Sequence, residues 1–363
     1  MRSIFSLEEL RRRDFLKTLG FGIGAVALDT LGGFPWAYAQ SSKEILLGTP
    51  SPARPIYDLA RYFASEKILK PETGMTLKEK TFRGFVPSFA AMMKGEVLYS
   101  YQTLPALTRA IKQKFPVKAF ADYAQQFVFY MIALPEIKDL DGLVDRIKQG
   151  VKSGKKFKIA SHSPASQTQI AINKILREKG VNPKTDVQIV FLRGTPKRLA
   201  ALKAKNVDAT VIFASRAIEN VMRGEINIIA KMSDFAPKQS LILWVATEET
   251  LSKRPKEVQL FTNTMVRGYR EMYKRDLDEL AEFAVSQKPW RKFKPVKAVR
   301  ETIKAAREME LWPVNGGMTE KNVNTALKFL VDTEFMKSDA VLPVDRLIEP
   351  KYRDQALKEL GPG

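Results

Sequence analysis

Two polar loops carry the residues best suited to bind or activate a small molecule. Residues 161–164 read Ser-His-Ser-Pro, and residues 193–196 read Arg-Gly-Thr-Pro. Hydroxyl, imidazole and guanidinium groups donate hydrogen bonds to carboxylate, sulfonate or phosphate oxygens. In each loop a hydroxyl residue precedes proline, so we expect Ser163 and Thr195 to cap helices that begin at the following prolines. The alternative is that both loops do no more than start helices.

The segments around these loops predict a parallel sheet. Residues 157–160, 187–191 and 209–213 are short and rich in β-branched and aromatic side chains, which is typical of buried strands. Segments of helical length separate them, and a strand, a crossover helix and a second strand indicate parallel pairing. Both polar loops then lie at carboxyl ends of strands, where open α/β sheets bind ligands and helix amino ends attract anions.

The same plan occurs earlier in the chain. A strand at 44–49 is followed by a helix at 56–63, a strand at 76–82, a helix at 88–94 and a strand at 97–101. The pair Arg83-Gly84 precedes Arg193-Gly194 by 110 positions, and other identities keep that offset. The sequence therefore predicts two similarly built α/β lobes. We expect the loops at 161–164 and 193–196 to face residues 83–88 across a cleft.

Two strand-like segments connect the predicted lobes. The chain passes from the first lobe to the second near residues 121–130 and returns near 233–247. Two neighbouring crossings make a hinge, and hinge closure around a ligand is an established mode of binding. From Lys253 onward the pattern is mostly helical, and we expect this tail to pack mainly on the first lobe.

The predicted organisation divides the chain into four parts. Residues 1–39 are a cleaved signal peptide, and residues 40–127 are the first part of lobe 1. Residues 128–239 are lobe 2, and residues 240–363 are the return to lobe 1 with C-terminal helices.

The amino-terminal segment has the order of a bacterial export signal. A basic region that includes Arg12-Arg13 precedes an apolar run at 19–28, which is too short to span a membrane, and Ala37-Tyr38-Ala39 forms a small-x-small cleavage site. Residues 12–17, Arg-Arg-Asp-Phe-Leu-Lys, are similar to the twin-arginine consensus. We expect a periplasmic product, exported by the twin-arginine or the general secretory route and without a stable membrane anchor. The alternative is an amphipathic helix that stays attached.

Composition excludes several classes of site. The chain has a formal charge of +20, but its basic residues are spread out and no nucleic-acid-binding motif accompanies them, so we expect no nucleic-acid partner. Cysteine is absent, which excludes disulfides, cysteine–metal sites and a cysteine nucleophile. His162 is the only histidine and has no acidic or histidine neighbour at ligand spacing, so we expect no metal and no cofactor.

The chain resembles the periplasmic substrate-binding proteins of ABC importers, in the group that binds sulfonates, nitrate and thiamine precursors. The resemblance rests on the export signal, on residues 48–50 (Gly-Thr-Pro), 94–97 (Lys-Gly-Glu-Val) and 137–143, and most strongly on 194–202 followed by 206–209. It covers residues 44–285 and implies an α/β, two-lobed periplasmic binding protein of the second type, with mixed, mainly parallel sheets and a ligand cleft between the lobes. The helical C-terminal extension is expected from the pattern after Lys253. The resemblance also implies a monomer that delivers its ligand to an ABC permease and its ATPase.

The expected ligand-binding residues stand at strand ends and helix starts. They are Pro52, Arg54, Arg83, Gly84, Phe85, Gln102 and Thr103 in lobe 1, and Ser161, His162, Ser163, Ser166, Arg193, Thr195, Phe213 and Arg216 in lobe 2. Arginine forks suit carboxylate, sulfonate or phosphate groups, and aromatic rings cover apolar parts. For each arginine the alternative is a solvated or ion-paired surface residue.

The predicted function is capture of a small organic ligand, anionic or aromatic, for delivery to a permease. A sensory binding protein that feeds a receptor is one alternative, and an enzyme of the thiamine-precursor type is another. The enzyme has little support, because Gly-x-Ser-x-Gly, Walker and Gly-x-Gly-x-x-Gly motifs are absent and the iron site of that enzyme depends on cysteine. We therefore expect no catalytic residues.

Overall fold

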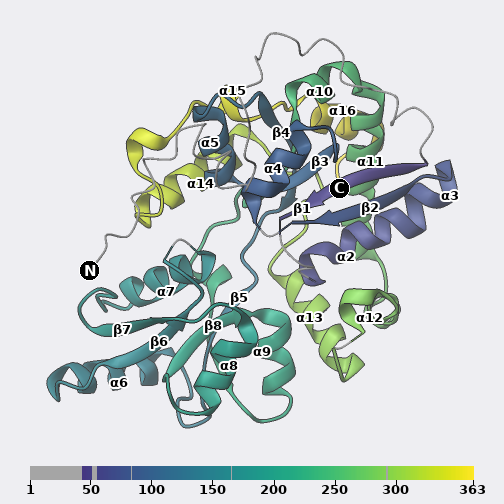
Figure 1. The fold of residues 1–363 in the computed structure, drawn as a ribbon. Coiled ribbons are helices and arrows are strands. Elements are labelled where there is room, and N and C mark those ends of the chain that lie inside the picture. Colours follow the sequence, from purple (N-terminus) through teal and green to yellow (C-terminus); the bar gives the residue numbers. More distant parts are fainter. Residues whose placement is uncertain (1–42, 51–54, 83, 165, 292) are drawn as a thin grey trace, which may run out of the picture.

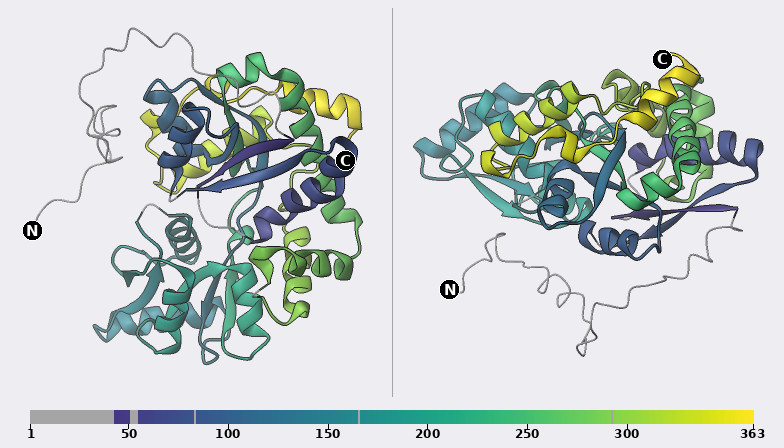
Figure 2. Two further views of the ribbon diagram at one scale, coloured as in Figure 1. Left: turned by 45° about the vertical axis from the view of Figure 1, so that its right-hand side comes forward. Right: turned by 90° about the horizontal axis from the view of Figure 1, so that it is seen from above.

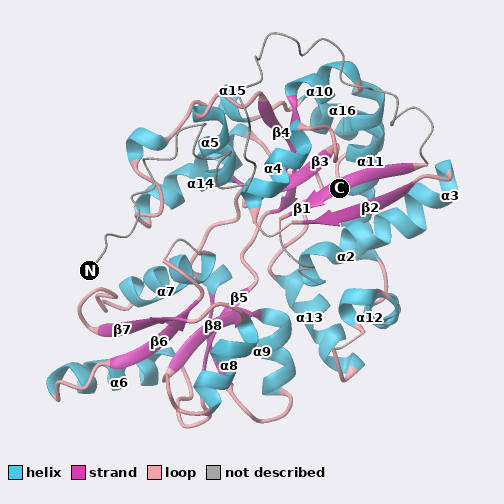
Figure 3. Ribbon diagram, in the orientation of Figure 1, coloured by secondary structure: helices cyan, strands magenta, loops and turns pink. Residues whose placement is uncertain are grey.

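The computed structural model describes residues 43–363 except 51–54, 83, 165 and 292. Its strands form two separate five-stranded sheets (Figures 1 and 3). The first has the order β2-β1-β3-β10-β4 and the second the order β7-β6-β8-β5-β9. In sheet one, β1 pairs in parallel with β2 and β3, whereas β10 runs antiparallel to β3 and β4. In sheet two, β6 pairs in parallel with β7 and β8, and β5 runs antiparallel to β8 and β9.

The first lobe is built around sheet one. Its strands are β1 (Glu44–Thr49), β2 (Thr76–Thr81), β3 (Tyr99–Thr103), β4 (Val117–Ala124) and β10 (Ile242–Thr247), and its helices are α2 (Pro55–Ala64), α3 (Lys70–Thr73), α4 (Phe85–Met93) and α5 (Leu104–Lys112). Aromatic rings fill its core, where Tyr101 stacks on Tyr123 with centroids 4.8 Å apart. The buried Trp244 meets Phe261 edge to face and donates from Nε1 to the hydroxyl of Tyr269 at 3.0 Å. These large buried rings form the core of the first lobe.

The second lobe repeats this plan around sheet two. Its strands are β5 (Phe129–Ala133), β6 (Phe157–Ser161), β7 (Val187–Phe191), β8 (Ala209–Phe213) and β9 (Asn227–Lys231), and its helices are α6 (Leu140–Lys152), α7 (Gln167–Glu178), α8 (Thr195–Lys203) and α9 (Ala214–Val221). The predicted α/β fold class with mixed sheets is confirmed, and each sheet has two parallel and two antiparallel strand pairings.

Equivalent glycines start one helix in each lobe. Gly84 caps α4 with φ +120°, and Gly194 caps α8 with φ +90°. Both helices follow an edge strand, β2 or β7, that pairs in parallel with the strand before it in the chain, β1 or β6. Positive φ angles in this range are readily adopted only by glycine. The spacing between Arg83-Gly84 and Arg193-Gly194 therefore reflects topologically equivalent turns.

Both helix caps expected in the polar loops of lobe 2 were wrong. Helix α7 begins at Gln167, and its cap is Ser166, whose hydroxyl accepts from the backbone N–H of Gln169. The hydroxyl of Ser166 also donates to the carbonyl of Ser163 at 2.7 Å, so the loop closes on Ser166. Helix α8 is capped by Gly194, and the hydroxyl of Thr195 accepts from Arg198 instead. In each loop a competing local hydrogen bond decides where the helix begins.

Two adjacent segments join the lobes. One runs from β4 to β5 and the other from β9 to β10. They hydrogen-bond to each other, since the N–H of Gln239 donates to the carbonyl of Gln125 at 3.0 Å and that of Leu241 donates to Ala124 at 3.2 Å. The crossing strands lie between the lobes in Figure 1.

The C-terminal part is helical, with α10 (Glu248–Lys253), α11 (Pro255–Lys274), α12 (Leu277–Ser286), α13 (Val296–Glu308), α14 (Glu320–Asp332), α15 (Val344–Leu347) and α16 (Lys351–Leu360). Helix α11 packs on α2, and α15 and α16 pack on β4, all in the first lobe (Figure 2). Helix α13 differs, because it packs on α9 of the second lobe as well as on α2 of the first. The tail therefore contacts both lobes.

Candidate functional site

A cavity of about 270 Å³ lies where the two lobes, the returning segment and the C-terminal helices meet. Its wall combines aromatic and aliphatic side chains with neutral polar groups, which is the usual composition of a small-molecule site. The lining residues are Phe85, Thr103, Leu104, Pro105, Phe127, His162, Ser163, Ser166, Gln167, Ile170, Gln239, Ser240, Leu241, Ala326, Leu330 and Phe335. The carboxyl ends of β3 and β6 open toward it, as expected for ligand sites of α/β sheets.

His162 belongs to the part of the cavity wall that the second lobe contributes. Contacts with Gly194 and Arg198 orient its ring. Its Nδ1 atom lies 3.3 Å from the backbone N–H of Gly194 and 3.4 Å from Nη1 of Arg198. Both neighbours can only donate, so Nδ1 must accept. These two contacts favour the tautomer that carries its proton on Nε2.

Arg198 is buried inside lobe 2 and contacts the His162 ring. Its side chain is 2% exposed, and its guanidinium donates to the carbonyls of Val211 at 3.2 Å and Leu192 at 3.1 Å. A further bond reaches the hydroxyl of Thr195 at 3.3 Å. Burial lowers the pKa of Arg198 to about 10, so the side chain remains a cation at neutral pH.

The returning segment contributes the central part of the wall. Gln239 is 1% exposed and lines the cavity, and its Nε2 has no hydrogen-bond partner among the described residues. Next to it, the hydroxyl of Ser240 donates to Oδ2 of Asp122 at 2.9 Å, and the N–H of Met318 donates to the same oxygen at 2.8 Å. Burial raises the pKa of Asp122 to about 7.

The remaining wall is apolar and comes from the C-terminal helices. Ala326 and Leu330 project from α14, and Phe335 follows that helix. The N–H of Ser240 donates to the carbonyl of Asn322 at 3.3 Å, so α14 is tied to the returning segment. A segment more than 80 positions beyond the second lobe thus closes one side of the cavity.

The structure brings together five of the residues expected to bind ligand. Phe85 and Thr103 from lobe 1 line the cavity with His162, Ser163 and Ser166 from lobe 2. The Ser-His-Ser-Pro loop therefore faces Phe85, as expected. The Arg-Gly-Thr-Pro loop does not line this cavity and contacts it only through His162.

Several expected residues lie behind the cavity wall or away from it. Gln102 is buried and donates to Ser100 at 2.8 Å, and Ser161 is buried beside Thr168. Gly84 lines a separate pocket between α4 and α5. Of the other expected residues, Arg193 is exposed, Thr195 accepts from Arg198, and Phe213 packs against the rings of Tyr57 and Phe129. Pro52, Arg54 and Arg83 lie outside the described residues, as does the predicted signal peptide.

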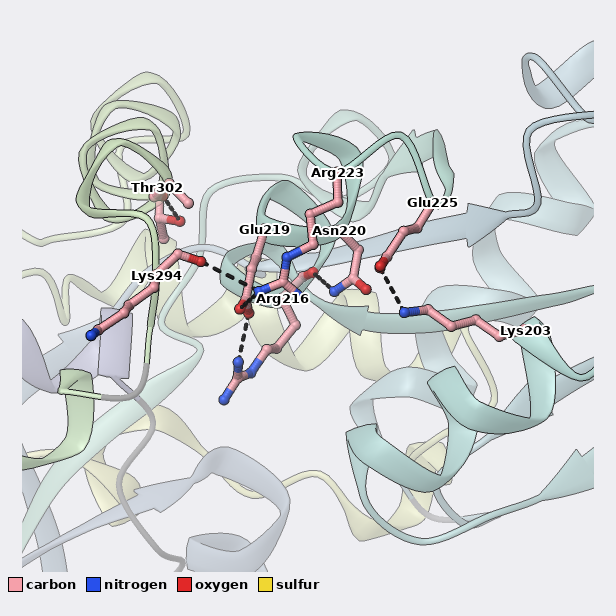
Figure 4. Close-up of polar contacts among 9 residues, drawn as sticks. Lys203, Arg216, Glu219, Asn220, Arg223, Glu225, Lys294 and Thr302 are labelled. Atoms are coloured by element: carbon pink, nitrogen blue, oxygen red, sulfur yellow. Dashed lines mark hydrogen bonds and ion pairs between the residues drawn. The ribbon is translucent and has the colours of Figure 1, made fainter.

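Arg216 is held in an ion-pair cluster between α9 and the C-terminal helices (Figure 4). Its Nη1 lies 2.6 Å from Oε2 of Glu219, a buried carboxylate that also accepts from Arg223 at 2.7 Å. The Arg216 guanidinium stands 4.0 Å from the ring centroid of Phe293. Arg223 reaches the carbonyl of Lys294 at 3.5 Å. The charge of Arg216 therefore has a protein partner, and its side chain joins α9 to the segment before α13.

No local sequence pattern pointed directly to Gln239, Arg198, Leu330 or Phe335. Arg198 lies inside the segment that carries the strongest family resemblance, four positions into a helix, where it reads as a surface residue. Gln239 lies in a predicted crossing segment, and the meeting of two crossings beside a cleft is the one sequence signal that points to it.

Neither a metal centre nor a membrane span is found in the described part of the chain. Its His, Asp and Glu side chains include no group of three placed to hold a metal ion. None of its helices combines the length and apolar character needed to cross a membrane.

Comparison with known proteins identifies solved structures with a similar fold. Among solved structures, the chain is similar to the periplasmic nitrate-binding protein NrtA from Synechocystis PCC 6803, at 13% identity and a TM-score of 0.68 over 88% of this chain and 90% of that one. It is also similar to the periplasmic aliphatic sulphonate binding protein SsuA from Escherichia coli, at 14% identity and a TM-score of 0.59 over 85% and 93% of the two chains.

A third similar structure is the ligand-binding component of an ABC-type import system from Staphylococcus aureus with zinc bound. It shares 12% identity and a TM-score of 0.65 over 86% of this chain and 98% of that one. At these identities the similarity establishes the fold. No curated protein matches the sequence. The NMT1-like family matches residues 89–284. Because this match spans more than half of the sequence, the chain belongs to the NMT1-like family.

Proposed function

We propose that this protein is an exported solute-binding protein that captures a small organic ligand in the cavity between its lobes and delivers it to an ABC permease and its ATPase. The observation that carries the proposal is the cavity itself. Its wall draws on both lobes and on the segment that connects them, as shown by Thr103, His162 and Gln239. A ligand that contacts both lobes binds the closed arrangement more tightly and shifts the population toward it.

The composition of the wall defines the class of ligand. Neutral donors such as Gln239 and the hydroxyl of Ser163 lie on one part of the wall, and Phe127, Leu330 and Phe335 on another. This division suits an organic molecule with one polar, acceptor-bearing group and an apolar or aromatic body. The similar structures named for sulphonate and nitrate binding support an importer role. Export to the periplasm, by the twin-arginine or the general secretory route, and action as a monomer are parts of the same proposal.

The test is a ligand screen on the mature chain, residues 40–363. Organic acids, sulfonates and pyrimidines are added singly while thermal unfolding is followed, and compounds that stabilise the protein are measured by calorimetry. A ligand at 100 times its Kd should stabilise the native state by about 2.7 kcal/mol. X-ray scattering with the bound ligand should show a more compact protein.

Two variants on α14 make the screen specific for the cavity. Ala326 lines the cavity, whereas Asn324 on the same helix is exposed. Ala326→Phe fills the cavity and should abolish binding, and Asn324→Phe should bind as the unaltered protein does. If no compound stabilises the protein but hydrolysis of a substrate appears, the enzyme alternative replaces transport. If binding survives Ala326→Phe, the ligand site is elsewhere.

A further inference from the structure

One cation in the second lobe is buried without an acidic partner. The acceptors around Arg198 are two carbonyls, a hydroxyl and the imidazole of His162, and all of them are neutral. No Asp or Glu of the described residues forms an ion pair with it. Taking a charge out of water without a counter-ion is costly, so buried cations are usually paired with carboxylates.

The other deeply buried arginine shows the usual arrangement. Arg61 in the first lobe is 1% exposed and pairs with Asp58 at 3.2 Å and with Glu79. Arg61 and Arg198 therefore differ in their counter-ions and not in their degree of burial. Among the described residues, no carboxylate pairs with Arg198, and this unpaired cation lies on the side of lobe 2 that faces the cavity.

His162 connects this cation to the cavity. The imidazole lies between the Arg198 guanidinium and the cavity, accepts at Nδ1 and carries its proton on Nε2. A positive charge behind an accepting Nδ1 polarises the ring and strengthens Nε2–H as a donor. Arg198 therefore affects the cavity through the His162 ring, although it does not line the cavity itself.

The remaining groups at this end of the cavity are also donors. Gln239 presents a buried Nε2 that has no partner among the described residues, and α7, a helix of 12 residues, begins at Gln167 on the same wall. The amino end of a helix carries a partial positive charge. Apart from His162, none of the described lining residues is acidic or basic, so no carboxylate on the described wall repels an anion.

The one buried acid nearby stands behind a different part of the wall. Asp122 accepts from Ser240 and from the backbone of Met318, and Arg353 on α16 contributes a positive field to it. The hydroxyl hydrogen of Ser240 is engaged in its hydrogen bond to Asp122, so toward a ligand the oxygen can only accept. An anionic group is therefore better placed beside His162 than beside Ser240.

We propose that Arg198 is a positioning residue that makes this cavity select anions, by fixing the tautomer of His162 and supplying the counter-charge through its ring. The selected group is an organic oxyanion, a carboxylate or a sulfonate, which lies beside the His162 ring and accepts from Nε2 of Gln239. The apolar body of the ligand lies toward Leu330 and Phe335. This inference rests on the proposed function of the same cavity and adds the residue that determines its specificity.

Matched acid and amide probes test the inference. Benzoate, phenylacetate and hexanoate are compared with benzamide, phenylacetamide and hexanamide by calorimetry, and butanesulfonate with butanesulfonamide. In the unaltered protein each acid that binds should do so at least tenfold more tightly than its amide. Arg198→Met should reduce this ratio to within about twofold while leaving amide binding unchanged, and Arg198→Lys should keep part of it. Lys197→Met removes an exposed cation from the same helix and should keep the full ratio.

The single histidine gives an independent readout. Nitrogen NMR of the His162 ring should show the Nε2–H tautomer at neutral pH in the unaltered protein and a mixture of tautomers in Arg198→Met. Adding an acid probe should shift the Nε2 signal. If Arg198→Met does not fold, as judged by circular dichroism, His162→Phe serves instead and should lose the preference for acids.

Three results would overturn the inference. They are equal binding of acids and amides by the unaltered protein, an undiminished preference in Arg198→Met or His162→Phe, and an Nδ1–H tautomer or no response of His162 to any acid probe. Binding of amides without a preference for acids would remove the inference and leave the binding function intact. Failure of every compound in the wider screen would remove the function itself.

Discussion

The ring of Tyr57 in the first lobe meets the ring of Phe213 in the second, edge to face, with centroids 6.4 Å apart and an interplanar angle of 84°. Tyr57 stands in the first turn of α2, and Phe213 ends β8. Tyr57 also lies 6.3 Å from Tyr123, and Phe213 lies 4.7 Å from Phe129, so each ring rests on the core of its own lobe. The two lobes therefore meet through a supported aromatic contact.

We predict that this contact couples the lobes energetically. In a double-mutant cycle of Tyr57→Leu and Phe213→Leu, the coupling free energy should be about 0.5–1.5 kcal/mol, the range for aromatic pairs. Urea unfolding of the four proteins measures it. Additive effects of the two substitutions would show that the rings do not stabilise each other.

The stability of the protein should fall as pH rises from about 4 to 7. The pKa of Asp122 is raised by burial from 3.8 to about 7, so between these values the folded state holds a proton that the unfolded state has lost. Each pKa unit is worth about 1.4 kcal/mol, and the loss should be on the order of 3–4 kcal/mol. Above about pH 8 both states are ionised at this residue and its contribution stays constant.

Asp122→Asn isolates this effect. The asparagine can keep an acceptor oxygen for Ser240 and Met318 but cannot ionise. Its free energy of unfolding, measured by urea titration at pH 4, 6 and 8, should vary less with pH than that of the unaltered protein by that amount. Equal pH profiles of the two proteins would contradict the assignment to Asp122.

Gly317 should tolerate no side chain. Its φ is +59°, and a Cβ atom would lie 2.0 Å from Oδ2 of Asp122. Gly317→Ala should destabilise the protein by about 3 kcal/mol or more, since a steric clash with a hydrogen-bonded carboxylate adds to the backbone strain of about 1–2 kcal/mol. Gly74→Ala is the matched control, because Gly74 has φ +70° and no atom within 4 Å of its Cβ position. Chemical denaturation of both variants gives the difference, and similar losses would show that backbone strain alone decides.

Ser166 should serve both the fold and the ligand. Ser166→Ala removes the cap of α7 and should cost about 1 kcal/mol of stability. Asp139→Ala removes the cap of α6, a helix of similar length away from the cavity, and should cost about the same. Of these two cap variants, only Ser166→Ala should also weaken binding of the compound selected in the screen, since Ser166 lines the cavity.

Ser163→Ala separates the two roles. It removes no cap, so it should weaken binding without loss of stability. Unchanged affinity in both serine variants would exclude this loop from ligand contact.

Export should depend on the arginine pair. Changing Arg12-Arg13 to Lys-Lys retains the charge but removes the guanidinium pair of the twin-arginine consensus, so periplasmic accumulation should stop. Fractionation of a bacterial host with both transport routes measures it. Unchanged accumulation would leave the general secretory route.

Local sequence patterns account for much of the fold. The strands around Ile159, Ile189 and Val211 were predicted at their observed positions, because short β-branched segments between helical segments leave few alternatives. The glycines at 84 and 194 were matched because the pair Arg-Gly recurs at an offset of 110 positions, and the structure shows that both have positive φ before a helix. The helix caps at 166 and 194 were missed because several adjacent serines, threonines and prolines compete for each cap, and local hydrogen bonds such as that from Ser166 to Ser163 decide among them.

The sequence by itself determined the two-lobed α/β fold and five residues of the cavity wall, since these follow from periodicity and from the ends of parallel strands. Only the tertiary structure decided the rest of the site. Gln239 and Leu330 reach the cavity because the returning segment and α14 pack beside the cleft. Arg198 acquires its significance because its neighbours in space are neutral acceptors and His162. The presence of a counter-ion, the degree of burial and the contact between segments far apart in the chain all depend on tertiary packing. No local sequence pattern encodes them.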